Sequence, residues 1–169
     1  MSLLAVAAVV GLLFVPTPTP VRDALPFSSV QNVRRKASGL HLDVLVKGGT
    51  KPVERLLEGD ELAAGDRLRF EVSSPAPGFV GVIGIDGTGT VSALAPPKGW
   101  LYALTTSDKI LLPDAVVLDN AAGAESLLLF LCEERQEIET LTVALRRNLD
   151  VAPFGCRTTR VNFNKRVGL

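Results

Sequence analysis

Apolar and polar residues alternate along much of the chain from residue 40 onward. In LHLDVLVK, which starts at residue 40, four apolar residues fall on one face, and RLRFEVS at 67–73 repeats the pattern. A period of two is typical of a half-buried β-strand. Alternating or continuously apolar segments predict further strands at 79–85, 90–95, 110–112, 115–118, 126–132 and 157–165.

One later segment has a helical period instead. Between Glu134 and Leu149, apolar residues recur three or four positions apart, at Ile138, Leu141, Leu145 and Leu149. Acidic residues fall near its start and basic residues near its end, as the helix dipole favours: Glu133, Glu134, Glu137, Arg146 and Arg147. Together these patterns predict a mainly β domain over residues 39–169. We expect an antiparallel β-sandwich of about seven or eight strands, with one amphipathic helix late in the chain.

The amino-terminal residues have a different character. Residues 3–15, LLAVAAVVGLLFV, are continuously apolar and predict an apolar helix over residues 1–15. Such a helix spans roughly 20 Å, less than the roughly 30 Å hydrocarbon core of a bilayer. A membrane anchor, an export signal and a buried core helix all remain open, although no basic residue precedes the run as in a typical export signal.

Residues 16–38 predict a linker. The segment opens with PTPTP at 16–20, which favours an extended spacer, and it contains the basic residues Arg34, Arg35 and Lys36. Basic residues behind an apolar run place the following domain in the cytoplasm by the positive-inside rule. This indication conflicts with an exported domain, and both locations stay open.

Four glycines in GVIGIDGTGT, at 81–90, raise the question of a phosphate-binding loop. A Walker-type loop ends in Gly-Lys-Ser/Thr before a helix, whereas this segment has no lysine and leads into a β-patterned stretch. Asp86-Gly87 instead predicts a two-residue hairpin turn. Gly81 and Gly84 lie inside the preceding strand and indicate a bulge or the close approach of another element.

Composition limits the chemistry that we expect. Eighteen basic and eighteen acidic residues cancel, so no global charge favours nucleic acid, and no nucleic-acid partner is expected. One histidine, His41, and two cysteines are too few for a zinc site within the chain. Asp114, Asp119 and Glu125 lie near turns, where a pair of carboxylates could serve a hydrolase, although turn acids commonly cap backbone NH groups. We expect no cofactor and no metal.

Two further features are a group of basic residues, which suggests contact with other molecules, and a pair of cysteines, whose state depends on the redox compartment. Basic residues gather at the carboxyl end, and together with the two strand glycines they form a candidate interaction surface: Gly81, Gly84, Arg157, Arg160, Lys165 and Arg166. Cys132 ends one predicted strand and Cys156 begins the last. They form a disulfide in an oxidising compartment or stay as two reduced, buried thiols otherwise.

The order of several segments resembles the bacterial domain of unknown function DUF 4384. The similar residues are LAAGDRLRF at 62–70, GFVGVIGID at 78–86 and Gly89. In that family a Gly-Asp-x-Leu-x-Phe segment precedes a Gly-Tyr-Val-like strand and an Asp-Gly turn, and here Phe79 stands where tyrosine is common. The later half is similar too, from Cys132 through a helix to PFGC at 153–156 and a last strand with Lys165, so that the resemblance covers roughly residues 40–166.

The resemblance implies an architecture and no activity. In delta-proteobacterial members the domain often follows one membrane helix, sometimes behind an anti-sigma-like zinc-binding segment, which this sequence lacks. We therefore expect a non-enzymatic module of the bacterial cell envelope, anchored in the inner membrane through residues 3–15 or periplasmic, that senses or binds a protein partner. It would be the outer part of a regulatory protein. The alternatives are an assembly subunit of an envelope complex and a hydrolase that uses the turn carboxylates.

Overall fold

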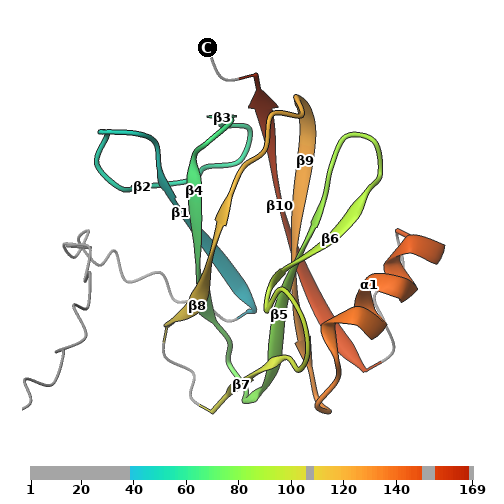
Figure 1. Ribbon diagram of the computed structural model, residues 1–169. Helices are drawn as coiled ribbons and strands as arrows, with labels where there is room; N and C mark the ends of the chain where they lie inside the picture. The colour runs from blue at the N-terminus through green and yellow to red at the C-terminus, as the bar shows by residue number, and fades with distance from the viewer. Residues whose placement is uncertain (1–38, 106–108, 150–154, 168–169) are drawn as a thin grey trace, which may run out of the picture. The chain divides into compact units, whose positions relative to one another are not determined.

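The computed structural model describes residues 39–105, 109–149 and 155–167. The expected apolar helix at 1–15 and the linker at 16–38 lie outside these ranges. Ten strands and one helix follow one another along the described residues (Figure 1): β1 His41–Lys47, β2 Glu54–Arg55, β3 Glu61–Ala63, β4 Arg67–Ser73, β5 Gly78–Ile85, β6 Val91–Ala95, β7 Tyr102–Leu104, β8 Ile110–Val117, β9 Gly123–Cys132, α1 Ile138–Arg147 and β10 Cys156–Arg166.

The strands form two sheets. The first has the order β2-β1-β4-β8, and the second has the order β3-β10-β9-β5-β6, with β7 also paired to β5. Every pairing is antiparallel except that of β3 with β10, which is parallel. The mainly β class and the mostly antiparallel pairing predicted from the sequence are therefore confirmed.

The interior faces of the two sheets share one apolar core. Alternate residues of β1 and β4, such as Val44 and Phe70, are buried against Val82 and Leu129 of the other sheet. The period of two in the sequence arises because only one face of β1 and β4 is covered. The opposite face of this first sheet carries the charged residues of the pattern.

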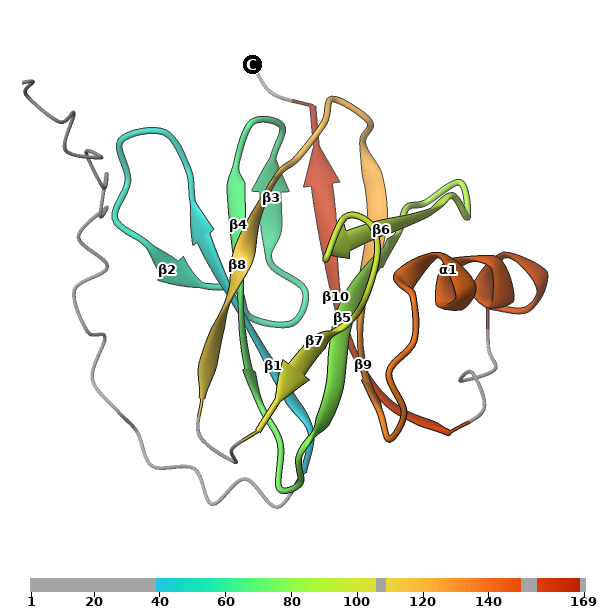
Figure 2. The same ribbon diagram turned by 60° about the horizontal axis from the view of Figure 1, so that its bottom comes forward.

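A second apolar cluster lies on the other side of β5 and β9. There Ile83, Phe130 and Cys132 pack against Ile138 and Leu141 of α1, and Figure 2 shows α1 beside this sheet. The second sheet is thus covered by the first sheet on one face and by α1 on the other. This arrangement explains why β5 and β9 are apolar on both faces, unlike β1 and β4.

The strand prediction needs two corrections. Residues 110–112 and 115–118 were expected as two strands around Pro113, but residues 110–117 form the single strand β8 and Leu118 follows it. The register of β8 is irregular opposite Arg69 and Glu71. Proline is tolerated there because β8 is an edge strand of its sheet. The short strands β2, β3 and β7 were not predicted, because two or three residues carry no recognisable period.

The predicted helix is too long at both ends. α1 begins at Ile138 with Glu137 as its N-cap and ends at Arg147, so Glu133 and Glu134 precede it and Leu149 follows it. Its buried face is made by Ile138, Leu141, Thr142 and Leu145. The acidic residues before it extended the apparent pattern, while the segment from Glu133 to Glu137 turns the chain from β9 onto the sheet.

The turn after β5 is wider than predicted. Asp86 and Thr90 close it through the bond from the Asp86 NH to the Thr90 carbonyl, and the Gly89 NH donates to the Asp86 carbonyl. Gly89 has a φ of 81°, whereas Gly87 is not among the glycines with positive φ. The Asp86 carboxylate accepts hydrogen bonds from the Thr88 and Thr90 NH groups. Asp86-Gly87 is therefore not a two-residue turn, because the carboxylate of Asp86 organises a longer one.

Candidate functional site

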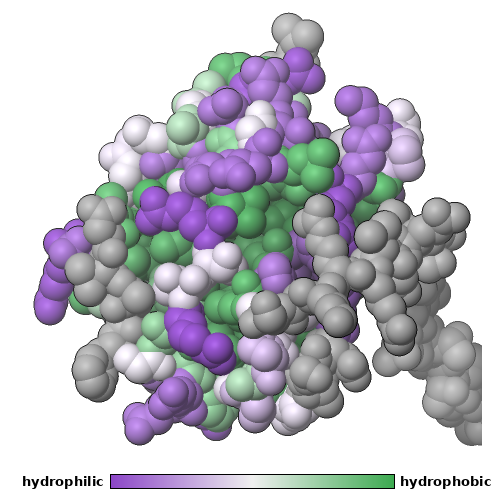
Figure 3. Space-filling view, turned by 180° about the vertical axis from the view of Figure 1, so that it is seen from behind, coloured by the Kyte–Doolittle hydropathy of each residue, from purple (hydrophilic) through white to green (hydrophobic). Residues whose placement is uncertain are grey.

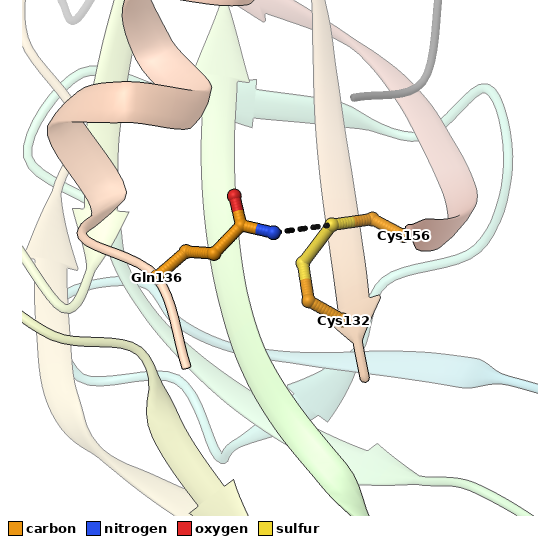
Figure 4. The surroundings of a disulfide bond; sticks show 3 residues. All are labelled: Cys132, Gln136 and Cys156. Carbon is orange, nitrogen blue, oxygen red and sulfur yellow. Dashed lines mark hydrogen bonds between the residues drawn. A yellow bond between two sulfur atoms is a disulfide. The ribbon is translucent and has the colours of Figure 1, made fainter. Parts of the chain in front are cut away.

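Cys132 and Cys156 lie directly opposite each other at the ends of β9 and β10. A disulfide joins them, and the side-chain amide of Gln136 lies 3.8 Å from the Cys156 sulfur (Figure 4). The bond closes a loop that contains α1, since the two cysteines are 24 positions apart. It therefore fixes both ends of the segment that covers the second sheet.

The four basic residues proposed as an interaction surface are divided between the two faces of β10. Side chains alternate along a strand, so Arg157 and Lys165 share the face of the buried Phe163, while Arg160 and Arg166 share the opposite face. Arg160 donates to the Leu149 carbonyl at 3.4 Å. These residues do not form one continuous basic patch.

Lys165 is the most enclosed of these charges. Its side chain is 3% exposed and forms ion pairs with Asp119, which is 75% exposed, and with Glu125, which is 14% exposed. Burial alone would lower the pKa of Lys165, but the hydrogen bonds to Asp119 and Glu125 outweigh it and raise the pKa above its ordinary value. The bond from Lys165 lowers the pKa of Asp119. Lys165 therefore stays charged, which suits an internal ion pair and not a nucleophile.

The three turn acids, Asp114, Asp119 and Glu125, take part in the contact at Lys165 and in one other contact. Asp119 and Glu125 meet at Lys165, and Asp114 accepts a short hydrogen bond from the Tyr102 hydroxyl. Burial and that bond raise the pKa of Tyr102 far above its ordinary value. His41 lies exposed at the start of β1. Each of these three turn acids is thus engaged by a cation or a hydroxyl of the chain itself.

Gly81 and Gly84 lie on opposite faces of β5, and other side chains of the chain approach both. A Cβ atom at Gly81 would lie 2.5 Å from Leu101 Cδ2 and 2.9 Å from Ile138 Cδ1. At Gly84 the nearest atom would be Leu94 Cδ1, at 3.0 Å. Gly81 is buried, so its small size allows α1 and the segment before β7 to pack against β5.

Two hollows lie near the ends of β10. One has a volume of about 390 Å³ and is lined by the β1–β2 connection, β3 and Arg166; the other, of about 250 Å³, is lined by the disulfide, Pro77 and Arg157. Both carry charges of either sign and a small apolar area, since Leu56 and Leu62 line the first and Leu131 the second. Nowhere in the described ranges do three or more His, Cys, Asp or Glu side chains converge to hold a metal ion.

Between these hollows, one edge of β10 has no neighbouring strand among the residues that the structure describes. β9 pairs with residues 156–165, but β3 pairs only with residues 164–166 on the other side. The sequence analysis missed this edge, because it depends on which strands become neighbours. A period of two predicts a strand, and says nothing about its partners.

A second surface feature was also missed. Trp100, in the connection between β6 and β7, is 50% exposed, and the Arg135 guanidinium lies 4.9 Å from the centre of its ring. Hydrogen bonds to the segment around α1 hold this connection, from the Ile138 NH to the Gly99 carbonyl and from the Leu101 NH to the Gln136 carbonyl. Figure 3 shows that, on the side opposite to Figure 1, apolar residues also reach the surface among hydrophilic ones.

Comparison with protein-family models, curated proteins and solved structures finds no match to this chain. α1 is too short and too polar to cross a membrane, and the same holds for any helix within the described residues. The site is therefore interpreted from its own geometry.

Proposed function

We propose that the chain is a non-enzymatic module of the bacterial cell envelope whose β domain binds a protein partner. In this proposal residues 3–15 anchor it in the inner membrane or direct its export, and the domain lies on the periplasmic side. The family resemblance supports the more specific role of the outer part of an anti-sigma-like regulatory protein.

The Cys132–Cys156 disulfide carries the proposal. Disulfides persist in oxidising compartments such as the periplasm and are rare where glutathione and thioredoxin keep thiols reduced. Here the bond joins the two strands on either side of α1. A periplasmic location is consistent with this bond and contradicts the positive-inside indication from Arg34, Arg35 and Lys36.

Thiol labelling in cells tests the location. Cells that express the full chain are lysed in acid, and the proteins are treated with a bulky maleimide before and after reduction. We expect the chain in the membrane or periplasmic fraction, with no label before reduction and two labels afterwards. The Cys132→Ser variant, which leaves one thiol, is the control for labelling. A chain in the cytoplasmic fraction that takes two labels without reduction would contradict the proposal.

Photocrosslinking tests the binding role. A photoreactive residue is placed at exposed positions on separate surfaces, such as Trp100, Val143 and Leu111, and crosslinked proteins are identified from intact cells. A protein crosslinked reproducibly from one surface and not from the others supports specific binding. Absence of any crosslink from all surfaces of an exported chain would contradict it.

A further inference from the structure

Most sheet edges of this domain are short or obstructed, which protects a β protein against unwanted pairing. β2 and β3 contain two and three residues, respectively. β8 is longer, but it contains Pro113, and the Arg69 guanidinium donates to the Leu112 carbonyl at 3.1 Å. At the remaining edge, β6 and β7 contain five and three residues and each pairs with one half of β5. The Arg146 guanidinium also donates to the Val91 carbonyl of β6 at 3.1 Å.

Within the described residues, these short strands leave two stretches without a neighbour on one side. They are residues 41–43 of β1, since β2 pairs only with Leu45 and Val46, and the longer first half of β10. On the side away from β9, the Asn162 carbonyl accepts from the Gly59 NH at 3.3 Å, and the Asn164 NH donates to the Asp60 carbonyl at 3.0 Å. Backbone groups of alternate residues point to the same side of a strand. The NH and carbonyl groups of Thr158 and Arg160 therefore point to this side as well.

These four groups have no hydrogen-bond partner within the described part of the chain. The Cα atoms of Cys132 and Cys156 are 4.0 Å apart. In an antiparallel pair, opposite residues that exchange no backbone hydrogen bonds lie closer together than those that do. The short distance therefore agrees with a backbone that points away from β9 at Cys156 and at alternate residues after it. An ordered strand that presents unpaired donors and acceptors is a template for another extended segment.

We infer that β10 binds an extended segment of the protein partner, which adds to the second sheet as a further strand along residues 156–161. This inference rests on the proposed binding function and specifies its surface. Inward-facing side chains of the added strand would lie beside Val161, which packs against the core. Outward-facing side chains would lie beside Thr158 and Arg160. The partner segment therefore alternates apolar with acidic residues.

A second copy of this chain fits the edge poorly. In an antiparallel pair, two residues lie opposite each other only if the backbone groups of both point toward the neighbouring strand or those of both point away from it. If two copies of β10 pair about a two-fold axis, one residue therefore lies opposite its own copy at the centre. Along the open edge this central residue is Thr158, Thr159 or Arg160. Each of these registers places two copies of Arg157 or of Arg160 opposite or diagonal to each other, which is unfavourable. A segment with its acidic residues on the outward face meets Arg160 as a partner.

Peptide binding to the purified full chain in mild detergent tests the inference. The probe is a capped peptide of about eight residues, a typical strand length with some margin, in which Val alternates with Glu. A second peptide carries Lys in place of Glu. Amide exchange and NMR shifts are measured with and without each peptide. We expect rapid exchange at Thr158 and Arg160 in the unbound chain, slow exchange at Thr159, and protection of the first two by the Glu peptide.

Two variants with one control make the test specific. Thr158→Pro removes an outward NH without removing a bond to β9, and we expect about a tenfold loss of affinity. Thr158→Val keeps the NH and should bind the Glu peptide as the wild type does. Arg160→Glu should reverse the preference between the two peptides, and it decides the question if Thr158→Pro fails to fold.

Three results would overturn the inference. They are slow exchange at Thr158 and Arg160 in the unbound chain, peptide-induced shifts confined to other elements, or unchanged preference in Arg160→Glu. Photocrosslinking from a photoreactive residue at Thr158 distinguishes a wrong binding surface from the absence of any binding function. A partner that crosslinks from another surface but not from Thr158 would leave the binding function standing and contradict the role of β10.

Discussion

At Gly81, side chains of α1 and of the segment before β7 closely approach β5. Its missing side chain leaves room for Leu101 and Ile138, both of which are buried. Because protein interiors are closely packed, atoms in such positions have little space to move away. The glycine is therefore a requirement of packing in the layer between the sheet and α1.

We expect Gly81→Ala to reduce the free energy of unfolding by about 1–3 kcal/mol through overpacking. Urea denaturation of the full chain in detergent measures the loss. Gly84→Ala is the matched control in the same strand, since its Cβ would meet only the end of the partly buried Leu94 side chain. A loss at Gly84 equal to or larger than that at Gly81 would contradict this account.

Lys165 shows a second residue-scale effect, a nearly buried charge that is held by two carboxylates. Replacing it by Met would leave Glu125, itself 14% exposed, without its cation. We expect Lys165→Met to cost roughly 3 kcal/mol near neutral pH. Arg166→Met, at the exposed neighbouring position on the other face, should change stability by no more than about 0.5 kcal/mol.

The pH dependence of this loss follows from the two shifted groups. The pKa of Lys165 is raised above its ordinary 10.5, so its contribution is complete below pH 10.5 and disappears as pH rises through the folded value. The pKa of Asp119 is lowered from 3.8, so its contribution exists above pH 3.8 and disappears as pH falls through the folded value. The difference in unfolding free energy between wild type and Lys165→Met should therefore be largest between these limits. A difference that is constant with pH would exclude the ion pairs as its cause.

At the scale of the element, the segment from Cys132 to Cys156 carries α1 away from β9 and returns the chain to β10. The disulfide closes this segment at its base, where the two strands are paired. Cross-linking a loop of this length restricts the unfolded chain and stabilises the fold by roughly 3 kcal/mol. The redox state of this bond thus contributes to the stability of the domain.

We expect a reductant to lower the free energy of unfolding by roughly 3 kcal/mol, measured by urea denaturation with and without dithiothreitol. The double variant Cys132→Ser, Cys156→Ser should be as unstable as the reduced wild type and should not respond to the reductant. An equal response in the double variant would show that the reductant acts elsewhere.

The elements also show what the sequence could predict. A period of two found β1 and β4 because one face of each is covered, and continuous apolar runs found β5 and β9 because both faces are covered. The turn at Asp86 was wrong in detail because a side chain, and not the Asp-Gly pair, organises it. The basic residues at the carboxyl end lie on both faces of β10, since side chains alternate along a strand, and their role in binding stays a prediction. The open edge of β10 depends on long-range pairing with β3 and β9, which no local pattern encodes.

At the scale of the whole molecule, the charge on β10 decides which strands can pair with it. Arg157 and Arg160 lie along the part of β10 that, within the described ranges, lacks a neighbouring strand on one side. Charged residues at an exposed edge oppose association of identical chains. Arg160, which favours an acidic partner strand, therefore acts together with Arg157 to keep copies of this chain apart.

Removing both charges should weaken that protection. We expect the double variant Arg157→Thr, Arg160→Thr to self-associate more strongly than the wild type, because its outward backbone groups remain while the like-charge repulsion is lost. Sedimentation velocity of the full chain in detergent, over a range of concentrations, measures the change. The control variant Arg67→Thr, Arg147→Thr loses the same charge at exposed positions away from β10 and should behave as the wild type does. Equal association of the two double variants would mean that net charge, and not the edge of β10, keeps the copies apart.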